Sequence, residues 1–287
     1  YNYQDYILDN IQHLLNIGCK DIAVITDKKF SKHFKKFNIP IEYPENYDDK
    51  YVKNADNYIK NNEKFRGGYW HFTSYRFTIL YLYMRKRKLI NILHLENDVL
   101  LYENPDKIKW HDKSKILITM DKYGVCTPGI MYIPNPDILK ILIDNFSVYY
   151  KGAINDMASI GKCFHEMDIL DTLPLFIDSD EYIKNEKTNF IVKNYEKYNC
   201  IFDARAIGQL LGGRDFVHRV HQKYEPYVNK DCEIPYNNYE IIWKDINKIK
   251  RPFIIIDNKE YRIMNLHIHS KRLSKFVNIK IIYYFIL

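Results

Sequence analysis

The apolar residues of this chain follow two different spacings in turn, and this alternation most limits the folds open to it. Between residues 6 and 17 they recur every three or four positions, which predicts an amphipathic helix ending near Gly18. A short apolar run at residues 21–27, bounded by aspartates, predicts a buried strand. The order recurs with a predicted helix at 73–87 and a predicted strand at 89–95. Helices alternating with strands indicate an α/β fold with a mostly parallel sheet.

The rest of the chain continues this pattern less regularly. Further strands are predicted at residues 116–120, 129–133, 253–257 and 261–269, and further helices at 136–150, 156–164 and 204–211. The stretch from Pro40 to Phe65 is rich in charged residues, Asn and Tyr, and is predicted to be irregular. With 287 residues and only 10 Gly and 10 Pro, the chain has no room for a long flexible linker, so a single domain is expected.

The cysteines and the apolar runs bear on the compartment. Five cysteines cannot all pair within the chain, and no Cys-x-x-Cys motif occurs, so reduced thiols in a reducing compartment, the cytoplasm, are expected. The longest apolar run, at residues 281–287, is far shorter than the ~20 residues of a membrane span, so none is expected. The chain begins with Tyr1 rather than Met, so a targeting segment upstream would lie outside this sequence.

The charge is moderately basic. Lys and Arg number 43 against 36 Asp and Glu, a net charge of +7 that attracts nucleic acid, anionic surfaces or phosphorylated substrates without choosing among them. Four cations, Arg85 to Lys88, end the predicted helix at 73–87. Cations in the last turn complement the helix dipole, so a solvated surface is favoured there over a nucleic-acid site.

An acidic pair directly follows the strand predicted at 89–95. In Glu96-Asn97-Asp98 the two carboxylates are two positions apart, so both reach the same side of the turn that leaves the strand. Ligands of open α/β sheets bind at this edge, and a divalent cation that also holds a diphosphate takes oxygen ligands. A solvated turn is the common alternative for such a pair, and its position after the strand gives the metal site equal weight.

Two other clusters of polar residues stand out. Strand alternation would place His267 and His269 on one face, with Lys271 just beyond the strand, suited to a metal and to phosphate respectively. Asp203 precedes a short predicted helix, and Gln209 lies almost two turns further on. These two residues either cap and complete a helix that stops at Gly212-Gly213, or line a substrate pocket, and the sequence leaves both alternatives open.

Together these motifs resemble a nucleotide-sugar glycosyltransferase of the GT-A fold, of the family 2 type. Tyr1-Asn2-Tyr3 and Thr26-Asp27 resemble the family's opening, and Arg76 followed by Leu95-Glu96-Asn97-Asp98 resembles the stretch up to its acid-x-acid (DXD) metal motif. The run from Cys126 to Ile133 is similar to the strand beneath the donor sugar, and His267 to Lys271 to the family's late His and Lys. The resemblance spans most of the chain.

The resemblance implies a Rossmann-like, mostly parallel sheet flanked by helices in one GT-A domain over residues 1–287. Its nucleotide-binding half would be about 1–120 and its acceptor-binding half about 121–287. The implied reaction moves a sugar from a nucleoside diphosphate sugar, a UDP-sugar, to a hydroxyl group of a glycan or protein. Mn²⁺ or Mg²⁺ is the implied cofactor, and no nucleic-acid partner is expected.

The resemblance also implies roles for single residues. Asp98 would bind the metal directly, Glu96 directly or through water, and His269 would supply a nitrogen ligand, preferred over His267 because it lies nearer the end of its strand. Donor binding falls to the five residues Asp27, Arg76, Glu96, Asn97 and Lys271, of which Arg76 and Lys271 would face phosphate. Asp203 would be the base for the acceptor hydroxyl, or Gln209 would steady the oxocarbenium ion if configuration is retained.

Two departures from the family pattern are visible. The motif is Glu-Asn-Asp instead of Asp-x-Asp, and the chain begins where the family's first strand has already ended, so that strand is missing unless the β-prone residues 278–287 replace it. Two other functions remain open. One is a metal-dependent sugar nucleotidyltransferase, which also uses paired acids, and the other is a non-catalytic nucleic-acid-binding protein.

Overall fold

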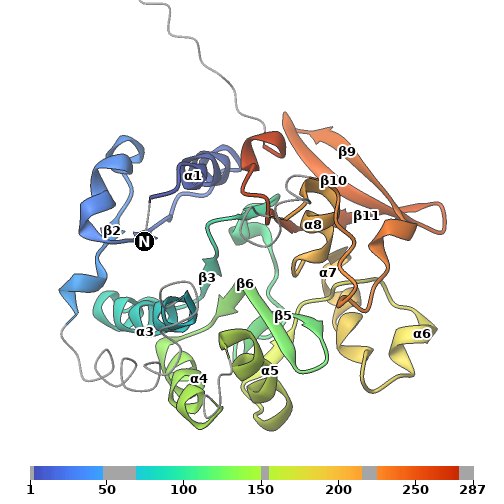
Figure 1. Ribbon diagram of the computed structural model, residues 1–287, viewed down its shortest axis with the longest axis horizontal. Coiled ribbons are helices and arrows are strands. Elements are labelled where there is room, and N and C mark those ends of the chain that lie inside the picture. The colour runs from blue at the N-terminus through green and yellow to red at the C-terminus, as the bar shows by residue number, and fades with distance from the viewer. Residues whose placement is uncertain (1–2, 48–68, 150–154, 215–224, 278–287) are drawn as a thin grey trace, which may run out of the picture.

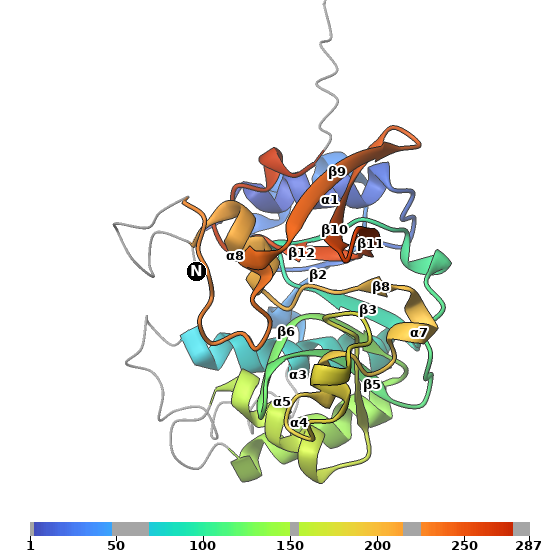
Figure 2. The same cartoon turned by 90° about the vertical axis from the view of Figure 1, so that its right-hand side faces the viewer.

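The structure, a computed structural model, describes residues 3–47, 69–149, 155–214 and 225–277. Its central sheet has the strand order β3-β6-β5-β7, formed by Ile92–Leu95, Val125–Ile133, Ile116–Lys122 and Leu170–Thr172. Three helices, α3 (Tyr69–Arg87), α4 (Pro136–Tyr149) and α5 (Asp156–Glu166), gather on one side of this sheet in both views (Figures 1 and 2). These helices also pack on one another, so the sheet and helices share one apolar core.

A second four-stranded sheet lies at the opposite end from these helices (Figures 1 and 2). Its order is β8-β11-β10-β9, formed by Cys200–Ile201, Lys259–Ile263, Ile249–Ile256 and Glu240–Ile246. Two strand pairs complete the sheets: β4 (Val99–Leu101) with β12 (Asn265–His267), and β1 (Val24–Ile25) with β2 (Ile41–Glu42). Between β7 and β9, the chain also forms the short helices α6 (Asp180–Ile183), α7 (Tyr195–Tyr198) and α8 (Ala206–Gly212).

The predicted helices are confirmed almost to their bounds, with α1 at Tyr6–Asn16 and α3, α4, α5 and α8 as given above. The mixed α/β class is also observed. The strand pairing differs from the prediction, because only the pairs β1–β2, β5–β7 and β8–β11 are parallel among the described residues, and the other five pairs are antiparallel. The sheets are therefore mixed and not mostly parallel.

Tight turns account for the antiparallel pairing. β9 and β10 are joined at Asn247 and Lys248, with φ of 54° and 64°, and β10 and β11 at Asp257 and Asn258, with φ of 49° and 59°. Two consecutive residues with positive φ are typical of the hairpin turns that reverse a strand onto its neighbour. β5 and β6 are joined through Gly124, whose φ is 72°. Short connections of this kind cannot link parallel strands, which need a crossover.

The strand predicted at 261–269 is interrupted at Met264. The amide of Met264 donates to Ile201 in β8, and its carbonyl accepts from Tyr102, which follows β4. The chain therefore changes neighbours there, so β11 ends at Ile263, β12 ends at His267, and His269 lies beyond both. The strand predicted at 21–27 is shorter, only β1. The stretch predicted to be irregular contains β2, and its residues from 48 onward lie outside the described ones, as do residues 278–287.

Helix α1 is attached to β4 by two buried polar side chains. Asn10 Nδ2 donates to the carbonyls of Asn97 and Val99, at 2.9 and 3.0 Å, and His13 Nε2 donates to the carbonyl of Leu101 at 2.7 Å. Since a carbonyl only accepts, Nε2 carries the proton in the neutral ring. Burial lowers the pKa of His13 to about 4.

We expect His13 to make folding sensitive to mild acid. The unfolded chain takes up a proton on His13 from about pH 6.5 downward, and the native state does so only near pH 4, so stability should fall between these values and then level off. The loss should reach about 3 kcal/mol. Urea unfolding should be measured across this pH range for the wild type and for His13→Gln, whose amide still donates to Leu101. The free energy of unfolding should fall more steeply toward acid pH in the wild type than in the variant. Parallel stability curves for the two proteins would contradict it.

Candidate metal centre

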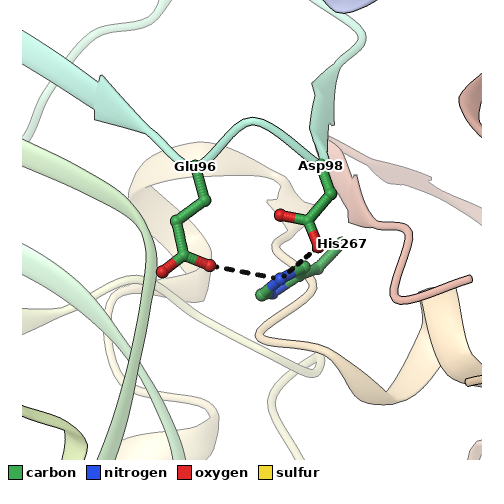
Figure 3. A group of neighbouring side chains, drawn as sticks. All are labelled: Glu96, Asp98 and His267. Atoms are coloured by element: carbon green, nitrogen blue, oxygen red, sulfur yellow. Dashed lines mark ion pairs between the residues drawn. The ribbon is translucent and has the colours of Figure 1, made fainter. Parts of the chain in front are cut away.

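The turn between β3 and β4 carries the two acids of the Glu-Asn-Asp motif. The amide of Glu96 donates to the carbonyl of Gly129 in β6, and the amide of Val99 closes the turn onto Glu96, at 2.8 and 3.0 Å. Asn10, from α1, holds the carbonyls on either side of Asp98. The turn is therefore fixed from three sides, and both carboxylates project from it in one direction (Figure 3).

His267 reaches these carboxylates from the other end of the chain. β12 pairs with β4 so that His267 lies opposite Val99, and the amide of Ile268 donates to the carbonyl of Asp98 at 2.8 Å. The Nε2 atom of His267 lies 3.3 Å from Glu96 Oε2 and 3.3 Å from Asp98 Oδ2 (Figure 3). One ligand atom from each of the three residues lies within 4.8 Å of the others.

The orientation of the His267 ring is fixed by its surroundings. Nδ1 donates to the carbonyl of Ala204 at 2.8 Å, which turns Nε2 toward the acids. A β-carbon added at Gly129 would lie 2.9 Å from Nδ1, and one added at Gly208 would lie 2.0 Å from the His267 carbonyl oxygen. A side chain at either glycine would therefore clash with the ring or the backbone of His267.

Two cations neutralise the acids of this cluster. Arg76, on α3, pairs with Glu96 and also with Asp156 at 3.1 Å, while Lys271 pairs with Asp98. Lys271 has a left-handed backbone, with φ of 62°, which costs roughly 1–2 kcal/mol for a side chain that is not Gly and is common at functional sites. The cluster is largely buried, and Asp98 and His267 expose only 4% of their surface each.

The pKa values follow from this pairing. Burial by itself would raise the pKa of Glu96 and Asp98, but Arg76 and Lys271 outweigh it, so the pKa of Glu96 is lowered and that of Asp98 lies well below its usual value. Burial would lower the pKa of His267, but the charges of Asp98 and Glu96 raise it to about 9. Both acids are therefore ionised at neutral pH.

This donor set suits a divalent cation. Octahedral ions such as Mg²⁺ hold oxygen ligands at about 2.1 Å, which places neighbouring ligand atoms about 3 Å apart. The 3.3 Å separations between His267 Nε2 and the two carboxylate oxygens are close to that spacing. The proton on His267 Nδ1 is held by a backbone carbonyl, as is usual for metal-binding imidazoles. Because the pKa of His267 is raised to about 9, a bound metal would displace the second proton, on Nε2.

Asp203 precedes the neighbouring helix α8, and Gln209 lies within it. Asp203 Oδ1 accepts from the amide of Ile207 at 3.0 Å, and Oδ2 accepts from the amides of Gly208 and His267 at 2.8 and 2.9 Å. Both carboxylate oxygens thus accept hydrogen bonds from backbone amides, which favours the capping alternative. Burial raises the pKa of Asp203 to about 6. Gln209 Nε2 lies 3.2 Å from His269 Nδ1, and its Oε1 has no hydrogen-bond partner among the described residues.

The other predicted residues take different places. The His269 ring lies 4.5 Å from the His267 ring, but His269 is outside the cluster that joins His267 to the acids. Asp27 follows β1 with a side chain 41% exposed and pairs with Lys29 at 3.3 Å. Asn97 contributes its carbonyl, which accepts from Asn10.

Two residues of the site were not found from the sequence. Asn10 reads as an ordinary polar residue of an amphipathic helix, and Asp156 as an acid in the first turn of α5, where acids are common. Asp156 is 2% exposed, pairs with Arg76, and its Oδ1 has no hydrogen-bond partner among the described residues. Only their burial, which a sequence does not show, separates them from surface residues of the same kind.

Comparisons with known proteins identify no family. No protein-family model matches the chain, and no curated protein matches it. Among solved structures it is similar to a glycosyltransferase involved in the glycosylation of the major capsid of PBCV-1, at 12% identity and a TM-score of 0.32, over 69% of this chain and 86% of that chain. No helix in the described residues is long and apolar enough to cross a membrane.

We expect Asp203→Asn to destabilise the protein by about 1–3 kcal/mol. An amide has only one oxygen, so at least one backbone amide would face an NH₂ group. Thermal unfolding checks this, with Asp168→Asn as the control because that side chain is 92% exposed. An unchanged melting temperature in Asp203→Asn would contradict this structural role.

Proposed function

We propose that this protein is a metal-dependent glycosyltransferase that transfers a sugar from a nucleoside diphosphate sugar, a UDP-sugar, to a hydroxyl group of a glycan or protein. The observation that carries the proposal is the meeting of Glu96, Asp98 and His267, with Arg76 and Lys271 beside them. Two acids, an imidazole and two cations together suit a metal that is bound along with an anionic diphosphate. The GT-A resemblance of the sequence names the same acids and cations, but it preferred His269 to His267 as the nitrogen ligand.

In this proposal the metal ligands are Asp98, His267 and Glu96. His267 replaces His269 as the first choice, because its Nε2 faces both carboxylates and its Nδ1 is tied to Ala204. Bound Mn²⁺ or Mg²⁺ would supply Lewis-acid stabilisation of the departing diphosphate. Asp203 acts as a positioning residue, since it accepts from the amide of His267.

The remaining groups would bind the donor. Lys271 and Arg76 would exchange part of their contact with Asp98 and Glu96 for phosphate oxygens, which are equally good partners for ammonium and guanidinium groups. Asp156 would hold Arg76 in place. Gln209 Oε1, which has no partner within the part of the chain that the structure describes, would accept from a sugar hydroxyl. Asp27 and Asn97 remain proposed donor contacts, and the division into a nucleotide half and an acceptor half near residue 120 remains a prediction.

We expect UDP to bind tightly only with Mn²⁺, and Asp98→Asn to remove that dependence. The substitution keeps the size of the side chain but removes the charge that Lys271 and a metal share. Calorimetry of UDP with Mn²⁺ and with EDTA tests this, with Asp106→Asn, an exposed acid, as the control. Equal affinity under both conditions in the wild type would refute the metal dependence, and pyrophosphate release from UTP and a sugar 1-phosphate would instead indicate a nucleotidyltransferase.

We expect Lys271→Met to act in opposite directions on two ligands. The Lys271 ammonium competes with a cation for Asp98, and a unit charge about 4 Å away is worth about 4 kcal/mol at an effective dielectric of 20. Mn²⁺ alone should therefore bind at least about tenfold more tightly. UDP with Mn²⁺ should bind more weakly, because a phosphate partner is lost. Lys275→Met, at an exposed lysine, is the control, and weaker binding of Mn²⁺ alone would contradict this role.

A further inference from the structure

Nine exposed cations lie on two segments that meet on the surface of this protein. The basic patch consists of Lys28, Lys29, Lys32, Lys35 and Lys36, which follow β1, and Arg85, Lys86, Arg87 and Lys88, which end α3. All nine side chains are exposed. Three acids, Asp27, Glu42 and Glu45, contact the same segments, so cations outnumber these acids by nine to three. The patch therefore keeps a strong positive charge.

The two segments of the basic patch meet at β2. Lys86 and Arg87 pair with Glu42, the last residue of β2, at 2.9 and 3.8 Å. The amide of Thr26 donates to the carbonyl of Glu42, and the amide of Lys28 donates to Glu45 Oε1, both at 3.0 Å. Both segments therefore border the same turn, and their charges add on one surface.

Apolar groups accompany the cations. Lys29 lies over the ring of Phe30 at 4.8 Å, and Lys36 over the ring of Phe37 at 4.9 Å, with both rings partly exposed. Ile90, two residues beyond Lys88, is 63% exposed, more than any other large apolar residue described. Phe34, between helices η1 (Lys28–His33) and η2 (Lys35–Phe37), packs in a small core with Ile11 and Val24. This packing fixes the segment that carries the five lysines.

We propose that the basic patch binds the surface of an anionic phospholipid membrane. Clustered lysines and arginines are attracted to acidic headgroups, and partly exposed apolar groups enter the region between headgroups and chains. Ile90 favours a lipid surface over a nucleic acid, which offers an aliphatic side chain little to bind. Arg76 lies nine residues before Arg85 on α3, about 14 Å along the helix, so the metal centre would lie near the membrane without touching it.

Vesicle sedimentation tests the proposal with the whole chain. The wild type should bind vesicles in which roughly a third of the lipid is phosphatidylserine, should bind phosphatidylcholine vesicles weakly, and should be released between about 0.05 and 0.5 M NaCl. The triple variant Lys32→Gln, Lys35→Gln, Lys36→Gln should lower the partition coefficient by roughly a hundredfold, since each lysine contributes about fivefold. The matched control is Lys187→Gln, Lys230→Gln, Lys259→Gln, which changes three exposed lysines elsewhere.

Three results would overturn the proposal. These are equal binding of the wild type to both kinds of vesicle, equal loss in the two triple variants, or binding of poly(U) RNA more tightly than of acidic vesicles. The salt titration uses only the wild type, so a triple variant that fails to fold leaves the test decisive. UDP and Mn²⁺ affinity should be unchanged in both triple variants, which separates the membrane proposal from the proposed function.

Discussion

Buried charges have to be paired, and this requirement organises the centre of the molecule. Three acids, two basic side chains and an imidazole are brought together where β3, β4, α3, α5 and β12 approach one another. Removing Arg76 would leave the buried acids Glu96 and Asp156 without their cation, which costs several kcal/mol. The pairs between Arg76 and Glu96 and between Lys271 and Asp98 therefore hold these elements together.

Asp203 shows how the scaffold fixes the position of His267. Its carboxylate joins the first turn of α8 to the amide of His267, while the carbonyl of Ala204 holds the imidazole from the same segment. Gly208 lets this helix approach the strand closely. A single turn of chain therefore sets both the backbone and the ring orientation of His267.

The sequence predicted the parts of this structure that depend on local patterns. Helices α1 and α3 to α5 follow from apolar spacing, and the acids of the Glu-Asn-Asp turn from their position after a strand. The antiparallel pairing depends on hairpins at Asn247 and Asp257, whose residues favour positive φ without requiring it. The preference for His269 over His267 assumed one continuous strand, and the break at Met264 depends on partners in β8 and β4 that lie far away in the sequence. Asn10 and Asp156 could not be found, because their importance comes from burial.

The pairing of β12 with β4 also has a consequence for synthesis of the protein. Asp98 and Lys271 are 173 positions apart, and His267 is held by the same late strand. Chains emerge from the ribosome at about 5–20 residues per second, so Asp98 is made roughly ten seconds or more before Lys271 and His267 exist. Arg76, the partner of Glu96, is made earlier than either acid. During that interval the carboxylates lack both the lysine and the imidazole that pair with them in the finished protein. The proposed metal centre would therefore be complete only after His267 has been synthesised and β12 has paired with β4.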